Sequence, residues 1–94
     1  MAEVTVATLN LFNRAGRWAE RLPLLVEQFL ELMPDVTGLQ EVDLVIDQGN
    51  WLAHLVNSRF GEEAYTIRHV TSPGRLAPWL ANAVMTIRYS ISAP

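Results

Sequence analysis

The stretch that decides the fold is PDVTGLQEVD, from Pro34 to Asp43. Val36 and Leu39 are apolar residues of the kind that fill a buried strand, and Pro34 stands where a preceding helical pattern stops. The strand then delivers a carboxylate, Glu41, at its far end. A packed strand gains no stability from a charge at its tip, so Glu41 is a candidate ligand for something outside the core.

The segment before this strand predicts one βαβ unit. Residues 3–12 (EVTVATLNLF) alternate and are rich in β-branched side chains, which is typical of a strand buried on both faces. Pro23 is expected near the first turn of the following helix or at a kink. The apolar residues that recur there at helical spacing are Trp18, Leu22, Leu25, Val26, Phe29, Leu30 and Met33. A strand, a helix and a strand in this order normally place two parallel strands side by side.

The rest of the chain predicts a second helix and two more strands. A loop spans 43–49, and Asp47 and Asn50 are candidate caps for a helix over 51–60 that ends at Gly61. Alternation then predicts a strand over 64–70, a turn-rich loop over 71–79 and a final strand over 82–91. The expected fold class is α/β, with the order β-α-β-α-β-β. Two helices can cover only one face of such a sheet, so the other face and an edge are expected to stay open, as in part of a larger domain.

The composition restricts the class of protein. The chain has 94 residues, of which 50% are hydrophobic, enough for one small globular domain. It has no cysteine, which excludes disulfides and thiolate metal sites. The net charge is −3 and every cation is an arginine, so contact with a nucleic acid would have to be local. No basic leader and no apolar run of membrane-spanning length are present, which predicts a soluble cytoplasmic chain.

Two polar residues stand at the ends of the first two strands. Asn10 ends the first and Glu41 ends the second. The carboxyl ends of neighbouring parallel strands meet at one edge of a sheet, where ligands bind in open α/β folds. A carboxylate with an amide oxygen suits Mg²⁺ or Mn²⁺, which completes its shell with water and substrate phosphate. Asn and Glu are also common at strand ends as turn formers and solvated charges, and spacing alone favours that plainer interpretation.

Two motifs change that balance. The segment Thr8–Asn10 (TLN) and the segment 34–41 (PDVTGLQE) resemble the opening of the endonuclease/exonuclease/phosphatase superfamily, whose members include deoxyribonuclease I. The family's first strand ends in Thr-x-Asn, and its second reads Pro-Asp-hydrophobic-x-x-Leu-Gln-Glu. A weaker similarity covers 81–91, with Ala81 in place of Gly and Ser90 in place of Pro. The resemblance implies that residues 1–94 are the N-terminal portion of a two-sheet α/β sandwich, a partial domain of this family.

The resemblance also implies an activity and a set of residues. It implies a phosphoesterase that depends on Mg²⁺ or Mn²⁺ and hydrolyses phosphodiester or phosphomonoester bonds. Glu41 would ligate the metal, and Asn10 would help to hold the metal or the phosphate. Asn82 and Arg14 are candidate substrate contacts, although a turn role and a solvated position are open for them. The implied substrate is a phosphate ester, in a nucleic acid, a phosphoinositide or a phospholipid headgroup.

The family's other catalytic groups do not match any part of this chain. The family places an Asp-x-Asn pair and a general-base histidine on later strands, so the resemblance implies that this piece alone is inactive or nearly so. The alternative is a non-catalytic half-domain that pairs an open sheet edge with a partner or with a second copy of itself.

Overall fold

The computed structural model describes residues 3–12, 17–70 and 80–87. The observed order of elements is β-α-β-α-β-β, as predicted. The elements are β1 (Val6–Asn10), α1 (Trp18–Leu32), β2 (Val36–Asp43), α2 (Gln48–Phe60), β3 (Tyr65–Val70) and β4 (Leu80–Ile87). The predicted loop over 71–79 and the last part of the predicted final strand, 88–91, lie outside the described residues.

The strands form one mixed sheet in the order β1-β2-β4-β3. β1 and β2 are parallel, with Val6 beside Val36 and Asn10 beside Gln40, which confirms the predicted βαβ unit. β4 is antiparallel to both β2 and β3. The carboxyl ends of β1 and β2 therefore lie together at one end of the sheet.

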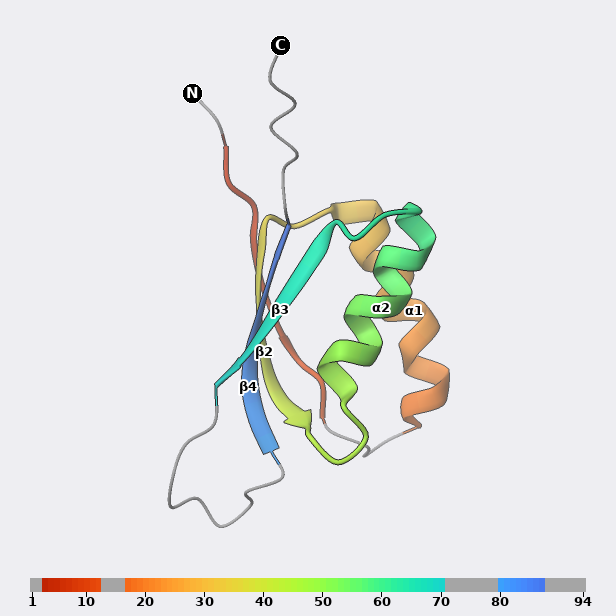
Figure 1. The fold of residues 1–94 in the computed structure, drawn as a ribbon, viewed down its shortest axis with the longest axis vertical. Helices are drawn as coiled ribbons and strands as arrows, with labels where there is room; N and C mark the ends of the chain where they lie inside the picture. Colours follow the sequence, from red (N-terminus) through yellow and green to blue (C-terminus); the bar gives the residue numbers. More distant parts are fainter. Residues whose placement is uncertain (1–2, 13–16, 71–79, 88–94) are drawn as a thin grey trace.

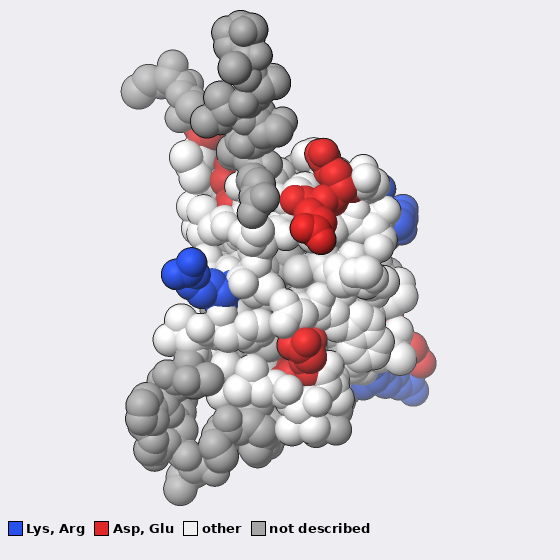
Figure 2. Space-filling view, in the orientation of Figure 1, with Lys and Arg blue, Asp and Glu red and all other residues white. Residues whose placement is uncertain are grey.

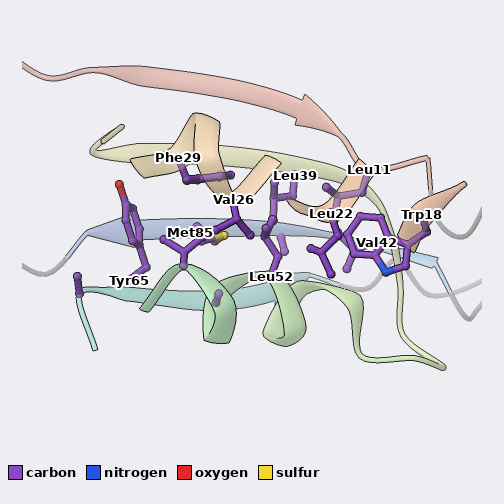
Figure 3. Close-up of a cluster of buried hydrophobic side chains, with 14 residues drawn as sticks. Leu11, Trp18, Leu22, Val26, Phe29, Leu39, Val42, Leu52, Tyr65 and Met85 are labelled. Atoms are coloured by element: carbon purple, nitrogen blue, oxygen red, sulfur yellow. The ribbon is translucent and has the colours of Figure 1, made fainter. Parts of the chain in front are cut away.

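Both helices cover the same face of this sheet (Figure 1). The core lies between the helices and the sheet, where side chains of both strands and helices interdigitate (Figure 3). Phe29 and Tyr65 meet edge to face with ring centroids 5.8 Å apart, and Trp18 meets Trp51 at 6.0 Å. The fully buried apolar side chains of this layer are Leu11, Leu39, Val42, Leu52, Val56 and Met85. Burial of each such side chain stabilises the fold by about 1.5–3 kcal/mol.

The opposite face of the sheet is open within the described chain, as predicted. Val6 is 71% exposed and Val4, just before the strand, is 66% exposed. Burial of the first strand on both faces is therefore not observed in this part of the chain. The reason is the alternation of the strand itself, because Leu9 packs against the helices while Val4 and Val6 point away from them.

The helix boundaries follow local chemistry. Met33, in the left-handed conformation, ends α1 and Pro34 follows it; Gly61 ends α2 in the same conformation, as predicted. α2 begins at Gln48 rather than at Trp51. Its start is set by the buried amide of Gln48, whose oxygen accepts the backbone N–H of Asp43 at 3.0 Å. Neither of these two described helices has the length and apolar character needed to cross a membrane.

Asp47 and Asn50 do not cap α2 as expected. Asp47 occupies the N-cap position but makes no side-chain cap, because its carboxylate accepts the Asn50 side-chain amide at 2.8 Å instead. The two candidate caps therefore bind each other.

Gly49 lets α2 approach β3 closely. A Cβ at this position would lie 2.6 Å from His69 Nε2 and 2.6 Å from Ile67 Cδ1. We expect Gly49→Ala to lower the free energy of unfolding, measured by urea denaturation. Overpacking of this kind typically destabilises by about 1–3 kcal/mol, which equals or exceeds the gain of about 1 kcal/mol from replacing Gly by Ala in a helix.

Gly38 offers the matched control. A Cβ there would meet Gln40 Nε2 at 3.5 Å, an ordinary contact. Gly38→Ala is expected to leave stability unchanged or to raise it slightly, since Ala restricts the unfolded chain. A Gly49→Ala variant more stable than the wild type would contradict the close packing of α2 on β3.

Tyr65 links the start of β3 to the end of α1. Its hydroxyl donates a hydrogen bond to the Pro34 carbonyl oxygen at 2.8 Å, and the residue is 2% exposed. Burial, with a smaller contribution from the charge of Asp35, raises the pKa of Tyr65 to about 12. Asp35 in turn accepts the backbone N–H of Thr5 at 2.7 Å, which ties the beginning of β1 to the same corner.

This raised pKa predicts an alkaline limit to stability. The folded state holds the phenolic proton more tightly than the unfolded chain, whose tyrosine pKa is about 10. The contribution to stability is thus fully present below about pH 10 and is lost as the pH rises toward 12. Urea denaturation at a series of alkaline pH values should show this decline in the wild type and a flatter dependence in Tyr65→Phe. Equal declines in the two proteins would refute it.

Candidate metal and phosphate site

A β-bulge shapes the end of β2. Leu39 pairs with Ala83 and Val42 pairs with Ala81, so two residues of β2, Gln40 and Glu41, lie opposite one residue of β4. Glu41 has φ 52°, in the left-handed region that residues other than glycine rarely adopt. Bulges of this kind turn a side chain out of the regular alternation. Leu39 and Val42 are three positions apart, so regular alternation would place them on opposite faces of the sheet. The bulge places both in the core, and Val42 has 0% exposure.

Asn10 and Glu41 are in direct contact on the open face of the sheet. Asn10 Nδ2 donates a hydrogen bond to Glu41 Oε2 at 2.6 Å. Asn10 Oδ1 accepts the backbone N–H of Phe12 at 2.7 Å, so both ends of the amide are fixed. A short bond to a carboxylate is among the stronger kinds of hydrogen bond in proteins. The geometry makes Asn10 a residue that orients Glu41, and the two predicted strand ends do meet.

A second polar pair lies one step back along the same two strands. The Gln40 amide and the Thr8 hydroxyl are hydrogen-bonded, with Nε2 to Oγ1 at 3.0 Å. Gly38 sits beside Thr8 in the register, and a Cβ there would meet Gln40 Nε2 at an ordinary 3.5 Å, so this pair does not depend on the glycine. Thr8 and Gln40 entered the sequence interpretation only as motif positions. Their positions in the sequence could have predicted this pair, because Thr8 is two residues before Asn10 and Gln40 is one residue before Glu41.

The other predicted site residues have different outcomes. Asn82 lies on β4 directly opposite the bulge, exposed between the buried Ala81 and Ala83, and so on the open face. Its side chain makes no hydrogen bond to Asn10 or Glu41 in the described part of the chain. Arg14 falls outside the described residues. Roles for Asn82 and Arg14 in substrate binding stay predictions.

The donor atoms fit a divalent cation in part. Glu41 contributes a half-buried carboxylate. The Asn10 side-chain oxygen accepts the Phe12 N–H with one lone pair and has a second lone pair that could contact a cation. Mg²⁺ is commonly held by one or two carboxylates and keeps several waters. Within residues 3–12, 17–70 and 80–87, no three His, Cys, Asp or Glu side chains gather in a way that could hold a metal. A single carboxylate of this kind is a weak site by itself.

Asp43, the acid nearest to Glu41 in sequence, serves the loop instead. It is fully buried, and its Oδ1 accepts the backbone N–H groups of Val45 and Ile46 at 2.8 and 3.3 Å. These bonds shape the turn that leads into α2.

The surface around the fold has no broad positive area in view. Figure 2 shows the described acidic and basic side chains of one face in small separate groups. The net charge is −3, so the chain has no long-range positive field that would attract a phosphate.

The backbone of Glu41 generates a prediction about stability. Replacing Glu41 by Gly or by Ala removes the same carboxylate and the same bond to Asn10, but only Gly tolerates φ 52° without strain. We expect the free energy of unfolding of Glu41→Gly, measured by urea denaturation, to exceed that of Glu41→Ala by about 1 kcal/mol. Equal stability of the two variants would mean that Glu41 does not occupy the left-handed region.

Comparison with known proteins gives a match in three-dimensional structure. No protein-family model and no curated protein matches this sequence. Among solved structures, the fold is similar to that of an endonuclease/exonuclease/phosphatase family protein from Leptotrichia buccalis C-1013-b, with a TM-score of 0.73 and 18% sequence identity. The similarity covers 89% of this chain and 37% of that protein, so this chain spans a little over a third of its length. This likeness shows the fold: the predicted α/β class and element order are confirmed, and the described strands and helices are arranged as in part of that protein.

Proposed function

We propose that this chain supplies the carboxylate of a divalent-metal site in a phosphoesterase. The observation that carries the proposal is the 2.6 Å contact between Asn10 Nδ2 and Glu41 Oε2, at the carboxyl ends of two parallel strands. The similarity of fold to an endonuclease/exonuclease/phosphatase family protein supports it. Glu41 is the proposed ligand of Mg²⁺ or Mn²⁺, and Asn10 its positioning partner and a contact for the metal or the phosphate.

Each residue has a defined task in this proposal. A bound Mg²⁺ would act as a Lewis acid on a phosphoryl oxygen. Asn10 holds the Glu41 carboxylate at a fixed place through one N–H, and Phe12 in turn holds Asn10. Both carboxylate and amide stand on paired strands rather than on a flexible loop, which keeps the site rigid. The proposed substrate is a phosphodiester or a phosphomonoester, carried by a nucleic acid, a phosphoinositide or a phospholipid headgroup.

A general base for the attacking water is proposed to come from elsewhere. Of the two described histidines, His54 is exposed on α2, which covers the opposite face of the sheet, and His69 packs against Gly49. Neither lies beside Glu41. Loss of a general base typically lowers the rate by about 10²–10⁴-fold. The 94-residue chain alone is therefore expected to bind the metal weakly and to catalyse little or nothing.

Metal binding can be tested without any activity. Mn²⁺ should broaden the backbone amide signals of residues 10 and 41 in an NMR titration of the wild type. Glu41→Gln keeps the shape and removes the charge, and should weaken this effect by about tenfold or more. Glu31→Gln, at an exposed acid on α1, is the charge-matched control and should leave the broadening unchanged. No response near residues 10 and 41 in the wild type would refute the proposed metal site.

Hydrolysis provides a separate test. With Mg²⁺ or Mn²⁺, the chain is expected to hydrolyse bis(4-nitrophenyl) phosphate no faster than the metal alone. Turnover that disappears in Glu41→Ala would show that the chain is a complete enzyme and that the proposed need for further catalytic groups is wrong. Metal binding without turnover is the outcome that the proposal expects.

A further inference from the structure

A half-buried arginine lies on the helix side of the candidate site. Arg21, near the start of α1, donates from Nη1 to the Leu11 carbonyl oxygen at 2.9 Å, just past the end of β1. Its guanidinium also lies over the ring of Trp18, 5.4 Å from the ring centroid. Trp18 is 7% exposed, and Figure 3 shows it at the same end of the core as Leu11. The fold therefore holds Arg21 against the backbone that follows Asn10.

The peptide group between Leu11 and Phe12 is bound at both ends. Its carbonyl oxygen accepts from Arg21, and its N–H donates to Asn10 Oδ1 at 2.7 Å. The peptide is trans, so its C=O and N–H point in opposite directions within one rigid plane. Because such a plane cannot turn at one end without turning at the other, Arg21 sets the direction in which the Phe12 N–H meets Asn10.

These contacts form a continuous series from a cation to an anion. Arg21 donates to the peptide, the peptide donates to Asn10 Oδ1, and Asn10 Nδ2 donates to Glu41 Oε2 at 2.6 Å. We call this series the Arg21–Glu41 network. Every donor points the same way, so the two amide dipoles lie head to tail between the guanidinium and the carboxylate. Hydrogen bonds aligned in this way polarise and strengthen one another, and those to charged groups are the stronger kind.

The backbone around the peptide is held in a strained conformation. Phe12 has φ 59°, in the left-handed region that costs an aromatic residue free energy. On the other side, the Leu11 N–H donates to the Gln40 carbonyl oxygen at 2.9 Å, and the Leu11 side chain is fully buried. Strain of this kind persists only where the surrounding contacts over-determine the conformation. The bond from Arg21 is one of those contacts, so its loss is expected to let the peptide turn.

We propose that Arg21 is a positioning residue for the Glu41 carboxylate, and that it acts through the Leu11–Phe12 peptide and Asn10. A planar guanidinium suits this task, because it can stack on an aromatic ring and donate to a carbonyl at the same time. The inference deepens the proposed function and rests on it, since the position of Glu41 matters to catalysis only where Glu41 holds the metal.

Amide hydrogen exchange tests the Arg21–Glu41 network without any metal. In Arg21→Gln, the Phe12 N–H should exchange with solvent about tenfold or more faster than in the wild type, because the peptide loses a bond from a charged donor. The backbone amide of Leu39, in the centre of the sheet, reports opening of the whole fold and should change less. Equal acceleration at Phe12 and Leu39 would mean that Arg21 only stabilises the fold, and would overturn the proposal.

Two further variants separate charge from position. Arg59→Gln is the matched control, because it removes the same charge from α2, where Arg59 Nη1 lies 2.6 Å from Glu27 Oε1. It should leave the exchange of Phe12 relative to Leu39 unchanged. Arg21→Lys keeps a cation and a donor but lacks the planar fork, so it should restore part of the protection that Arg21→Gln loses. An effect of Arg59→Gln as large as that of Arg21→Gln would contradict the proposal.

A Mn²⁺ titration followed by NMR connects this network with the site. Arg21→Gln should weaken the broadening of the amide signals of residues 10 and 41 by about tenfold or more, as is typical when a group that orients a metal ligand is removed. Arg59→Gln should leave it unchanged. Faster exchange at Phe12 with unchanged Mn²⁺ affinity would overturn the positioning role. A wild type that gives no response would refute the metal site itself, and the exchange data would then stand alone for or against the link from Arg21 to Asn10.

A measurement on the wild type covers the case in which Arg21→Gln does not fold. The Arg21 guanidinium protons should exchange with water more slowly than those of Arg17, whose side chain is 80% exposed. The reason is that the Leu11 carbonyl oxygen holds a proton of Arg21 in a half-buried place. Equally fast exchange of the two guanidinium groups would overturn the proposed contact.

Discussion

The β-bulge at Gln40 and Glu41 is the constraint on which both the core and the site depend. Without it, strict alternation would place Glu41 on the helix-covered face with Leu39, where an unpaired charge is strongly unfavourable. The extra residue instead brings Val42 back to the core and leaves the carboxylate on the open face, against Asn10. One irregularity in the ladder therefore allows a continuous apolar layer and an accessible acid to share a single strand.

Much of this architecture follows from local patterns in the sequence. The two helices, the four strands and the parallel pairing of the first two strands were predictable, because each depends on periodicity and on a short connection. The start of α2 at Gln48 was not, because a buried hydrogen bond to the Asp43 backbone sets it. The bulge was not predictable either. It exists only in the pairing with β4, far along the chain, and so leaves no local signal at Glu41.

The candidate site was predictable as a pair of residues but not as a network. Sequence position alone placed Asn10 and Glu41 at neighbouring strand ends. The structure shows what the neighbouring motif residues do, because Thr8 and Gln40 form the adjacent hydrogen-bonded pair across the same two strands. The motif letters thus correspond to physical contacts between β1 and β2. This agrees with a fold similarity that persists at 18% sequence identity.

The left-handed backbone of Glu41 also affects how the sequence can drift. Most residues are strained in this conformation, whereas glycine and asparagine adopt it readily. Selection for folding alone would therefore move this position toward glycine or asparagine over many generations. A glutamate retained here would need a contribution that offsets this strain, either its hydrogen bond to Asn10 or a task outside folding. The identity of residue 41 in descendants of this chain would therefore show whether anything beyond the backbone conformation constrains this position.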